Sequence, residues 1–488
     1  MSQFTTTIDT GSSDVTSRDE EDGLVALMIA WSAEEGDRAG EVALFEAEGS
    51  ALVLGRGEGE GGRVVFCRQR PGLNDRRPPL ASPGISREQL RIRLRHGKLE
   101  IEQIGRCPLI VKGEPVKRAT IAPGESLLLK RQLLLHCTTR PRRLAPFRGA
   151  LADLPVFGEP DAQGITGESP AAWRLRDQIA WLGRADEHTL ILGPSGSGKE
   201  LAARAIHAGS TRALKPFVAR NAATIPAGLV EAELFGNIKG YPNPGMPERS
   251  GLVGAANKGT LFLDEIGELP VALQASLLRV LDQGGEYHPL GGASVMRSNF
   301  RLIGATNRDA SALKHDLAAR LVLRLELPDL RARRDDVPLL ARHLLRRAAE
   351  KSPAALERFV EKSGPRAGEV RVKPSLVEQL LQIRFSTNVR GLDAVLWRAV
   401  SLSEGDAVEG SPALADAIAG EPAAAGEDRE TPIGARPPPT EEEIKNALAA
   451  AGGSITRAAE ALGLPSRYAL YRLMKKLGID GGDARGGG

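Results

Sequence analysis

A glycine-rich segment that ends in a lysine occupies residues 193–199 and reads Gly-Pro-Ser-Gly-Ser-Gly-Lys. An apolar segment, 189–192, precedes it, and a helix-forming segment begins at Glu200. Glycines allow backbone N–H groups to turn toward phosphate oxygens, and the lysine and the helix N-terminus add positive charge. We therefore predict a nucleotide-phosphate site formed by Gly193, Pro194, Ser195, Gly196, Ser197, Gly198, Lys199 and Glu200. The general pattern has Ser or Thr at position 200, so a glycine-rich turn without a ligand is the alternative.

Two adjacent carboxylates, Asp264 and Glu265, follow the apolar segment 260–263. In parallel α/β sheets, carboxylates at such a strand end lie beside the phosphate loop. Asp264 can hold Mg²⁺ through water, and Glu265 can orient and activate an attacking water. The pair therefore predicts hydrolysis of a nucleoside triphosphate, and an acidic strand end in solvent is the alternative.

The predicted elements place both motifs in a central α/β unit. Between about 164 and 330, short buried strands alternate with amphipathic helices, which is typical of a parallel sheet, and 331–403 is mostly helical. Residues 23–140 contain short apolar or alternating segments separated by turns, which predicts an all-β domain. Within it, the leucines and isoleucine of 90–95 (Leu-Arg-Ile-Arg-Leu-Arg) face inward and the arginines outward. Segment 404–439 is rich in Ala, Pro, Gly and acidic residues and predicts a linker.

Composition limits the class of protein. The 488 residues suggest about three domains, and a net charge of only +3 means that any nucleic-acid contact must come from a local basic patch. Three scattered cysteines, Cys67, Cys107 and Cys137, argue against a disulfide framework or a zinc site. The polar, acidic residues 1–22 do not resemble a signal peptide, and the apolar run 24–31 is far shorter than the ~20 residues that span a bilayer. We expect a soluble, cytoplasmic protein without membrane contact.

Several segments in order resemble one family. They include "GITGESPAAWRLRDQIA", "GPSGSGKELAARAIH", "KGTLFLDEIGELP", "RLIGATNRD" and "NVRGL", and they look like the central AAA+ domain of bacterial enhancer-binding proteins, the sigma-54-dependent transcriptional activators. The resemblance covers about 164–403 and implies an ATPase with ATP and Mg²⁺ as cofactors. In that family Glu commonly follows the lysine, so Glu200 agrees with the resemblance.

The resemblance assigns roles to further residues. Asn221 matches the residue that restrains the catalytic glutamate, Thr306 and Asn307 match the sensor of the γ-phosphate, and Arg390 matches the sensor arginine of the lid. Arg320 matches the arginine finger that reaches the nucleotide of a neighbouring subunit, where a guanidinium stabilises transferred charge. This implies a homo-oligomer, from dimer to hexameric ring. An ordinary surface arginine is the alternative for Arg320.

One loop departs from the family. Its members carry Gly-Ala-Phe-Thr-Gly-Ala, which contacts sigma-54, where this chain reads Gly240-Tyr241-Pro242-Asn243-Pro244-Gly245. Prolines fix φ and remove N–H donors, so we expect a stiffer tip that does not grip sigma-54 in the family's way. Two interpretations stay open. The chain acts on the RNA polymerase sigma factor sigma-54, or it acts on another polymerase form or as a repressor.

The all-β segment resembles a forkhead-associated (FHA) domain, a β-sandwich that binds phosphothreonine peptides. The resemblance rests on "LVLGRG", "PGISREQLRI" and "IEQIGRCPLIVKGEPV", and it implies that Arg56, Ser86 and Arg87 contact phosphate. Gln89 stands where the family has a scaffold histidine, and Cys107 where it has an asparagine. The implied partner is a phosphothreonine protein or a Ser/Thr kinase. The alternatives are an unmodified partner or packing against the ATPase.

The C-terminal segment 440–480 predicts three short helices, with an Ala-Ala-x-x-Leu-Gly helix, a tight turn and a basic helix in the order of a helix-turn-helix. It resembles the Fis-type DNA-binding domain, and a solvated helical hairpin is the alternative. The predicted DNA contacts are Arg467, Tyr468, Arg472, Lys475 and Lys476. The implied partner is DNA at sites upstream of promoters.

These predictions describe a multidomain, DNA-bound regulator. Its fold class combines an N-terminal all-β sandwich, a central α/β AAA+ ATPase with a helical lid and a C-terminal all-α unit. The predicted order is a disordered N-terminus (1–22), an FHA-like domain (23–140), a linker (141–163), an ATPase domain (164–403, lid 331–403), a second linker (404–439), the helix-turn-helix (440–480) and a flexible tail (481–488). The alternative is a phospho-dependent DNA-binding adaptor whose ATPase domain only gates oligomerisation.

Overall fold

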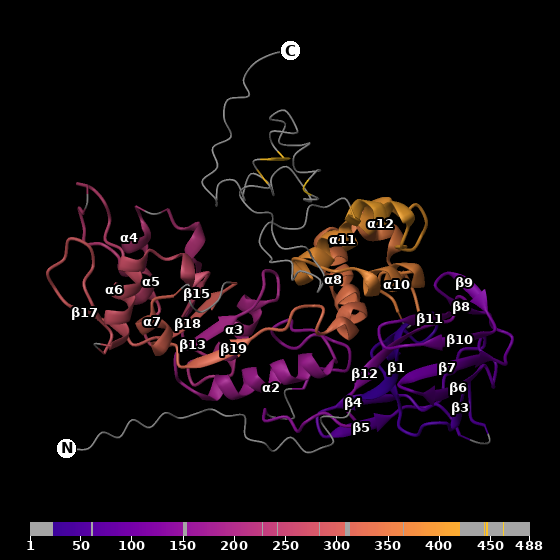
Figure 1. Ribbon diagram of the computed structural model, residues 1–488. Helices are drawn as coiled ribbons and strands as arrows, with labels where there is room; N and C mark the ends of the chain where they lie inside the picture. The colour runs from indigo at the N-terminus through magenta and orange to yellow at the C-terminus, as the bar shows by residue number, and fades with distance from the viewer. Residues whose placement is uncertain are drawn as a thin grey trace, which may run out of the picture. The chain divides into compact units, whose positions relative to one another are not determined.

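The computed structural model describes residues 23–419 apart from 60–61, 150–153, 227, 242, 283, 308–312 and 365, together with residues 444, 446, 447 and 462 (Figure 1). The chain divides into two compact units, 1–423 and 424–488. The predictions for 1–22 and for nearly all of 440–488 therefore lie outside the described residues.

Residues 24–140 form a β-sandwich, which is drawn in indigo and purple in Figure 1. One sheet has the order β5-β4-β2-β1-β12-β11-β8-β9, and the other has the order β10-β7-β6-β3. The prediction of an all-β domain is confirmed. In β6 the apolar residues of 90–95 are buried and its arginines lie on the outer side, as predicted. The strands are β1 (Leu24–Ser32), β2 (Val42–Phe45), β3 (Ala51–Leu54), β4 (Cys67–Arg70), β5 (Leu73–Arg76), β6 (Leu90–Arg95), β7 (Lys98–Gln103), β8 (Leu109–Val111), β9 (Glu114–Val116), β10 (Arg118–Ile121), β11 (Ser126–Leu129) and β12 (Leu133–Arg140).

The central unit is a parallel sheet in the order β14-β15-β18-β13-β19, as the alternating pattern predicted. Successive side chains of a strand point to opposite faces, so Leu261 and Leu263 of β15 join one core cluster and Phe262 the other. The strands are β13 (Thr189–Leu192), β14 (Phe217–Asn221), β15 (Thr260–Asp264), β18 (Arg301–Thr306) and β19 (Leu323–Glu326), with a small pair, β16 (Glu286–Tyr287) and β17 (Met296–Arg297). The helices are α2 (Pro170–Arg184), α3 (Lys199–Ala208), α4 (Val230–Phe235), α5 (Gly251–Ala255), α6 (Val271–Asp282) and α7 (His315–Arg320).

The helical lid follows the sheet and extends further than predicted. Val408 is fully buried and pairs with Val372, Leu414 is fully buried, and α12 begins at Pro412. The linker predicted at 404–439 therefore starts too early. Its Ala- and Pro-rich composition is also compatible with a short helix, since proline is favourable in the first turn. The lid helices are α8 (Val337–Lys351), α9 (Pro353–Leu356), α10 (Pro374–Gln382), α11 (Asn388–Leu402) and α12 (Pro412–Ala419).

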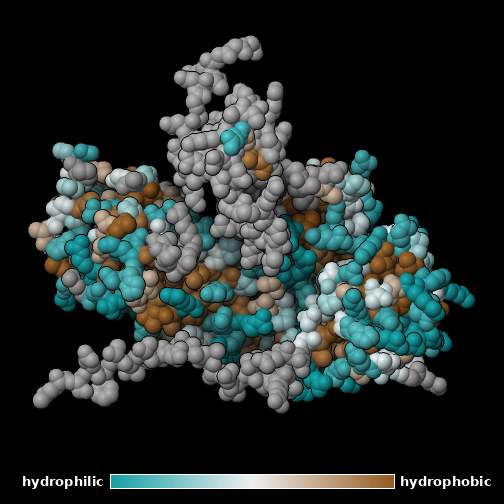
Figure 2. Space-filling view, in the orientation of Figure 1, coloured by the Kyte–Doolittle hydropathy of each residue, from teal (hydrophilic) through white to brown (hydrophobic). Residues whose placement is uncertain are grey.

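The β-sandwich and the lid share one hydrophobic core. Met28 and Ala30 of β1 lie in the same cluster as Leu376 and Leu380 of α10, and the indole N–H of Trp31 donates to the Val372 carbonyl at 2.8 Å. The neighbouring side chains of β1 lie in the core of the sandwich itself, so this strand is buried on both faces. On the face that Figure 2 shows, hydrophilic residues alternate with hydrophobic patches over the outside of the molecule. The β-sandwich therefore packs against the lid of the ATPase unit.

Candidate nucleotide site

The predicted phosphate loop connects β13 to α3. Gly196 and Gly198 have φ values of 73° and 101°, a region that residues with a side chain rarely adopt, and Gly198 caps α3. Lys199 is 7% exposed, and its ammonium group donates to the Gly193 carbonyl at 3.1 Å. The hydroxyl of Ser197 is buried and has no hydrogen-bond partner among the described residues. The loop therefore presents backbone N–H groups, an ammonium group and an unused hydroxyl to a ligand.

The two carboxylates lie at the end of β15 beside this loop. Lys199 Nζ is 3.7 Å from Glu265 Oε1, and Glu265 Oε2 accepts from the Asn307 N–H at 3.2 Å. Glu265 has φ 50° and ψ 46°, a left-handed conformation that is uncommon for a residue with a side chain and that is often found at functional sites. Burial raises the pKa of Asp264, the charge of Lys199 lowers it and the charge of Glu265 raises it. The structure thus brings the predicted lysine, carboxylates and Asn307 together.

Asn221 and Thr306 end the strands on either side of β15. Asn221 is the register partner of Asp264, and its side-chain oxygen accepts from the Ala223 N–H at 2.9 Å. Its side chain caps the following turn, and Asn221 lines the same cavity as Glu265. Thr306 is 1% exposed, and its carbonyl accepts from the Gly193 N–H at 3.3 Å.

The first turn of α11 closes over the phosphate loop. Arg390 Nη1 donates to the Ser195 hydroxyl at 3.1 Å, the Asn388 side-chain N–H donates to the Ser195 carbonyl at 3.0 Å, and the Val389 N–H donates to the Gly196 carbonyl at 3.2 Å. Asn388 also accepts from the Leu330 N–H at 2.8 Å, at the junction between the sheet and the lid. The lid sensor Arg390 was predicted, whereas Asn388 was missed although it lies two residues away in "NVRGL".

A cavity of about 410 Å³ lies between the phosphate loop, segment 164–166 and the lid. Besides the phosphate loop, segment 164–166 and α8 contribute residues to the lining of the cavity. Sequence reasoning missed the α8 wall, although its members follow the helical spacing of three to four residues. Residues of the lid that line the cavity are Arg333, Leu340, His343, Leu344, Arg347, Val389, Arg390 and Asp393.

Arg320, the predicted arginine finger, lies elsewhere. It ends α7, its side chain is 56% exposed, and its Nε is 2.5 Å from Asp282 Oδ1 at the end of α6. It is outside the set of described residues that line the cavity of its own chain. Within one chain the structure therefore separates Arg320 from the other predicted site residues.

Comparison with known proteins gives a consistent result. The model of the sigma-54 interaction domain matches residues 165–330, that of the AAA+ ATPase lid domain matches 331–430, and that of the bacterial regulatory protein, Fis family, matches 441–477. Regulatory protein AtoC of Escherichia coli (strain K12) is 37% identical over 334 residues, which cover 65% of this chain and 68% of that protein. The chain belongs to the sigma-54-dependent transcriptional regulators.

Other members of this family and one solved structure are also similar to the chain. Response regulator protein PilR of Pseudomonas aeruginosa is 37% identical over 360 residues, covering 70% of this chain and 77% of that protein. NtrX from Brucella abortus in complex with ADP aligns with a TM-score of 0.45 and 30% identity, covering 65% of this chain and 70% of that chain. The predictions of an ATPase of the AAA+ class and of a Fis-type helix-turn-helix are confirmed at the level of the family.

The loop 240–246 of this sigma-54-dependent regulator is a compact hairpin. The Gly240 N–H donates to the Met246 carbonyl at 2.8 Å, and the Met246 N–H donates to the Asn243 carbonyl at 3.1 Å across a Pro-Gly turn in which Gly245 has φ 95°. Pro242 lies outside the described residues. The stiffer tip that the two prolines predict stays a prediction.

Two side chains, those of Asn237 and Tyr241, hold this hairpin at its base. The Asn237 side chain, 2% exposed, donates to the carbonyls of Ile238, Tyr241 and Pro247 at 3.0, 3.1 and 3.0 Å. The ring of Tyr241 lies against Gly291, where an added Cβ would be 2.5 Å from the ring. The aromatic residue of this loop therefore packs on the neighbouring 288–292 loop while its side chain remains 41% exposed.

The predicted phosphate-contacting residues of the β-sandwich lie on adjoining loops. The Arg56 N–H donates to the Ser86 carbonyl at 3.0 Å, and Arg63 Nη1 donates to the Arg87 carbonyl at 2.7 Å. The Ser86 hydroxyl accepts from the Arg106 N–H at 3.0 Å, and Arg87 is exposed. The backbones of Arg56, Ser86 and Arg87 thus lie on adjoining loops of the sandwich.

Gln89 takes over the scaffold position at these loops. Its side chain is fully buried, and its oxygen accepts from the N–H groups of Ser86 and Cys107 at 3.3 and 3.2 Å. Its amide group donates to the Cys107 carbonyl at 2.7 Å. A Cβ on Gly105 would lie 2.4 Å from the Gln89 oxygen, so the loop passes too closely for a side chain there. The glutamine therefore ties together the loops that carry Ser86 and Cys107.

The remaining predictions concern DNA, metal and membrane. The predicted DNA-contacting residues lie outside the described residues, and they are Arg467, Tyr468, Arg472, Lys475 and Lys476. Among the described residues, no group of three or more His, Cys, Asp or Glu side chains could hold a metal ion. Within the same ranges, no helix is long and apolar enough to cross a membrane.

Proposed function

We propose that this sigma-54-dependent regulator is a cytoplasmic, DNA-bound ATPase that hydrolyses ATP in a ring and uses the hydrolysis to remodel an RNA polymerase complex. The observation that carries the proposal is the single cavity lined by the phosphate loop, the Asp264–Glu265 pair and the lid residue Arg390. Each of these groups has a distinct task in phosphoryl transfer.

The residues of the cavity divide the work of hydrolysis. Lys199 and the loop N–H groups bind the phosphates, and Glu265 orients the attacking water and accepts its proton. Asp264 suits Mg²⁺, because this ion is held by one or two carboxylates together with waters and phosphates and needs no larger set of protein ligands. The unpaired hydroxyl of Ser197 gives the loop a further group for a phosphate or for water of the ion. Bound Mg²⁺ would neutralise charge that develops on the phosphates.

Arg320 completes the site from a neighbouring subunit in this proposal. Its exposed position on α7, apart from the cavity of its own chain, supports a role in trans. To reach another nucleotide it must leave Asp282, and a surface ion pair of this kind contributes only about 0–1 kcal/mol. Turnover per subunit should therefore rise with protein concentration as the ring assembles.

Turnover measurements test this proposal. Purified full-length protein should hydrolyse ATP with a specific activity that rises with concentration, and Glu265→Gln should bind ATP but lose turnover at least about a hundredfold. Glu268→Gln, which changes a nearby glutamate outside the cavity lining, serves as the matched control. Nucleotide binding without turnover would instead support the adaptor that uses ATP only to oligomerise.

Sigma-54 is the partner that family membership suggests, but the 240–246 hairpin favours a second candidate. Tyr241 packs on Gly291, the tip is a Pro-Gly turn, and the loop differs in sequence and chemistry from the family's Gly-Ala-Phe-Thr-Gly-Ala segment. The second candidate is a regulator that acts on another polymerase form or as a repressor. Protein mixed with sigma-54 and a trapped transition-state analogue of ATP should form a stable complex if sigma-54 is engaged, and its absence would favour the second candidate.

The β-sandwich supplies the input in this proposal, by binding phosphothreonine on a partner protein or a Ser/Thr kinase. The adjoining placement of Arg56, Ser86 and Arg87 supports it, because two guanidinium groups and a hydroxyl suit a dianionic phosphate. Titration with matched phosphothreonine and threonine peptides tests it. Equal affinity for both peptides would exclude a phosphate reader and would leave packing on the lid as the role of the domain.

A further inference from the structure

Arg140, the last residue of β12, is buried where the β-sandwich meets the nucleotide-binding unit. Its side chain is 1% exposed, although arginine is seldom buried without partners. Arg140 Nε lies 2.9 Å from Asp335 Oδ2, and Arg140 Nη1 donates to the Glu168 carbonyl at 3.0 Å. The Thr138 hydroxyl, on the same strand, also donates to Asp335 Oδ2 at 3.0 Å. One strand of the sandwich is thus joined to two separate segments of the ATPase.

Residues next to those two segments line the nucleotide cavity. Residues 164–166 line the cavity just before Glu168, and Arg333 lines it just before Asp335. Asp335 lies two residues before the start of α8, which supplies four of the eight described lid residues that line the cavity. Arg140 therefore connects the segment before α2 to the segment before α8, from a position outside the cavity.

Asp336 closes the connection from the other side. The side chain of Asp336 is completely buried. One of its oxygens accepts from the N–H groups of Glu168 and Ser169 at 2.7 and 2.8 Å. The Ser169 hydroxyl donates to its second oxygen at 2.6 Å and also caps α2. The path runs from Arg140 through the Glu168 backbone to Asp336, and the neighbouring residue Asp335, which is partly exposed, pairs with Arg140 again. Each member is costly to unpair in such a site.

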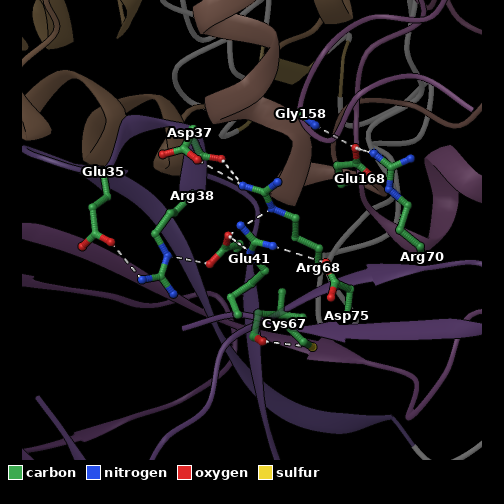
Figure 3. Close-up of polar contacts among 12 residues, drawn as sticks. Glu35, Asp37, Arg38, Glu41, Cys67, Arg68, Arg70, Asp75, Gly158 and Glu168 are labelled. Carbon is green, nitrogen blue, oxygen red and sulfur yellow. Dashed lines mark hydrogen bonds and ion pairs between the residues drawn. The ribbon is translucent and has the colours of Figure 1, made fainter. Parts of the chain in front are cut away.

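A second strand of the sandwich holds the same glutamate. Figure 3 shows the Glu168 carboxylate beside Arg70 of β4 and the Gly158 N–H, at 3.3 and 2.8 Å from the same oxygen. Its other oxygen accepts from the indole N–H of Trp173 at 3.0 Å. Burial raises the pKa of Glu168 and the charge of Arg70 lowers it. Glu168 is therefore fixed by the sandwich at its side chain and at its carbonyl.

The strand that carries Arg70 is itself braced. Figure 3 shows fully buried Glu41 between Arg38 and Arg68, with Nε–Oε distances of 2.7 and 3.1 Å. The Arg68 guanidinium lies 4.9 Å from the centre of the Phe157 ring, in the segment that leads to the ATPase. Position changes of β4 and β12 relative to the lid are therefore opposed by packing as well as by charge.

We propose that Arg140 is a positioning residue for the nucleotide site, through which the β-sandwich sets the separation of the 164–169 segment and α8. When the sandwich is seated, both walls of the cavity are held at the spacing that binds ATP; when Arg140 is unpaired, the walls separate and ATP binds less tightly. The inference rests on the proposal that this cavity holds ATP. It does not depend on whether the sandwich binds phosphothreonine.

Nucleotide affinity in the full-length protein tests this role. Arg140→Met keeps much of the side-chain volume and removes the charge, and the Kd of a fluorescent ATP analogue should rise about fivefold or more, within the range of measured couplings between sites. KM for ATP should rise with it, while kcat at saturating ATP changes less than about twofold, because Lys199, Glu265 and the other cavity groups are intact. Arg118→Met, which removes an exposed arginine paired with Glu102 in the same domain, is the matched control and should leave Kd unchanged.

A merely structural role predicts a different outcome. Loss of stability alone would lower the melting temperature of Arg140→Met and leave the Kd of the folded protein as in the wild type, which would overturn the proposal. An equal rise in Kd for Arg118→Met would overturn it as well. If Arg140→Met fails to fold, Thr138→Val removes a single contact to Asp335 and should still weaken binding, and an unchanged Kd there would contradict the role of this contact set. A wild-type protein that binds no ATP analogue would refute the nucleotide site itself, which is a separate failure.

The pair of charges provides an internal check. Asp335→Asn should weaken ATP binding, and the double variant Arg140→Met with Asp335→Asn should be no weaker than Arg140→Met alone, because both changes break the same contact. Additive effects of the two substitutions would show that they act independently, and this would contradict the proposed connection.

Discussion

The thiol of Cys67 gives a direct measure of whether the β-sandwich is seated on the lid. Cys67 belongs to the core that the two domains share, is 6% exposed, and its thiol donates to the Val42 carbonyl at 3.3 Å. Burial raises its pKa from 9.0 to about 11. Cys137 lies in the separate core of the sandwich, where burial raises its thiol pKa to about 12. The two thiols therefore report on different events, separation of the domains and unfolding of the sandwich.

The expected rate follows from the thiolate fraction, because the thiolate is the reactive form. At pH 8 a pKa of about 11 leaves about one thiolate in a thousand, whereas a pKa of 9.0 leaves about one in ten. Cys67 should thus react with iodoacetamide at least about a hundredfold more slowly in the native protein than in denaturant, and steric occlusion slows it further. Raising the pH from 8 to 9 should increase the native rate about tenfold, since the group is still far below its pKa.

The assay is timed alkylation of full-length protein, followed by digestion and mass spectrometry of the cysteine peptides. Loss of the Arg140 charge alone would raise the pKa of Cys67 and slow its reaction. Faster alkylation of Cys67 in Arg140→Met, with Cys137 still protected, is therefore the result expected if the two domains separate. A native Cys67 that reacts within about tenfold of its rate in denaturant would refute the shared core. Equal acceleration of Cys67 and Cys137 would indicate general unfolding rather than separation of the two domains.

Three further perturbations have defined outcomes. Gly196→Ala should weaken ATP binding by about tenfold or more, because a left-handed residue with a side chain costs about 1–2 kcal/mol and the new Cβ would lie 2.1 Å from the Thr387 carbonyl oxygen. Fluorescence titration measures the affinity, and an unchanged Kd would contradict the loop conformation. Arg320→Ala and Glu265→Gln should each be inactive alone but recover up to about a quarter of wild-type turnover when mixed in equal amounts, if the arginine acts in trans. No recovery in a phosphate-release assay would argue against that role. Leu376→Ala, in the shared core, should lower the free energy of unfolding by about 2–5 kcal/mol in urea titration, and a loss below 1 kcal/mol would show that the site is not tightly packed.

The central unit could be predicted because its signals are local. The glycines at 196 and 198 and the lysine at 199 are adjacent in sequence and fix the backbone of the loop that they form. The strand ends that carry Asp264 and Thr306 follow from short apolar runs, and parallel strands bring their carboxyl ends to one edge. Geometry of this kind depends on few long-range contacts, so the sequence is sufficient for it.

The connection between the sandwich and the ATPase could not be predicted in the same way. Arg140 and Asp335 are far apart in sequence, and each is an ordinary charged residue at the end of an element. One signal was present: residues 24–30 are apolar without alternation, which is typical of a strand that is covered on both faces. A sandwich strand needs only one buried face, so this run indicated a further layer.

Departures from a family pattern also proved hard to interpret from sequence. Gln89 departs from the pattern of the domain that the sequence resembles, yet its amide can both donate and accept, and it makes these contacts with Ser86 and Cys107. Val408 and Leu414 lie in a composition typical of linkers but are fully buried in the lid. A single apolar residue among alanines and prolines gives no period from which burial could be inferred.

The shared core has an evolutionary consequence. If the domains of a regulator were independent of one another, recombination could exchange its N-terminal domain for another. Here the sheet that contains β1 packs on the lid, and loss of Met28, Val42 and Leu134 would leave cavities in the core that the sandwich shares with the lid. A chimaera that carries a foreign input domain would need matching changes on α8 and α10. Inheritance should therefore keep this sandwich and this lid together, and substitutions across their boundary should occur in compensating pairs.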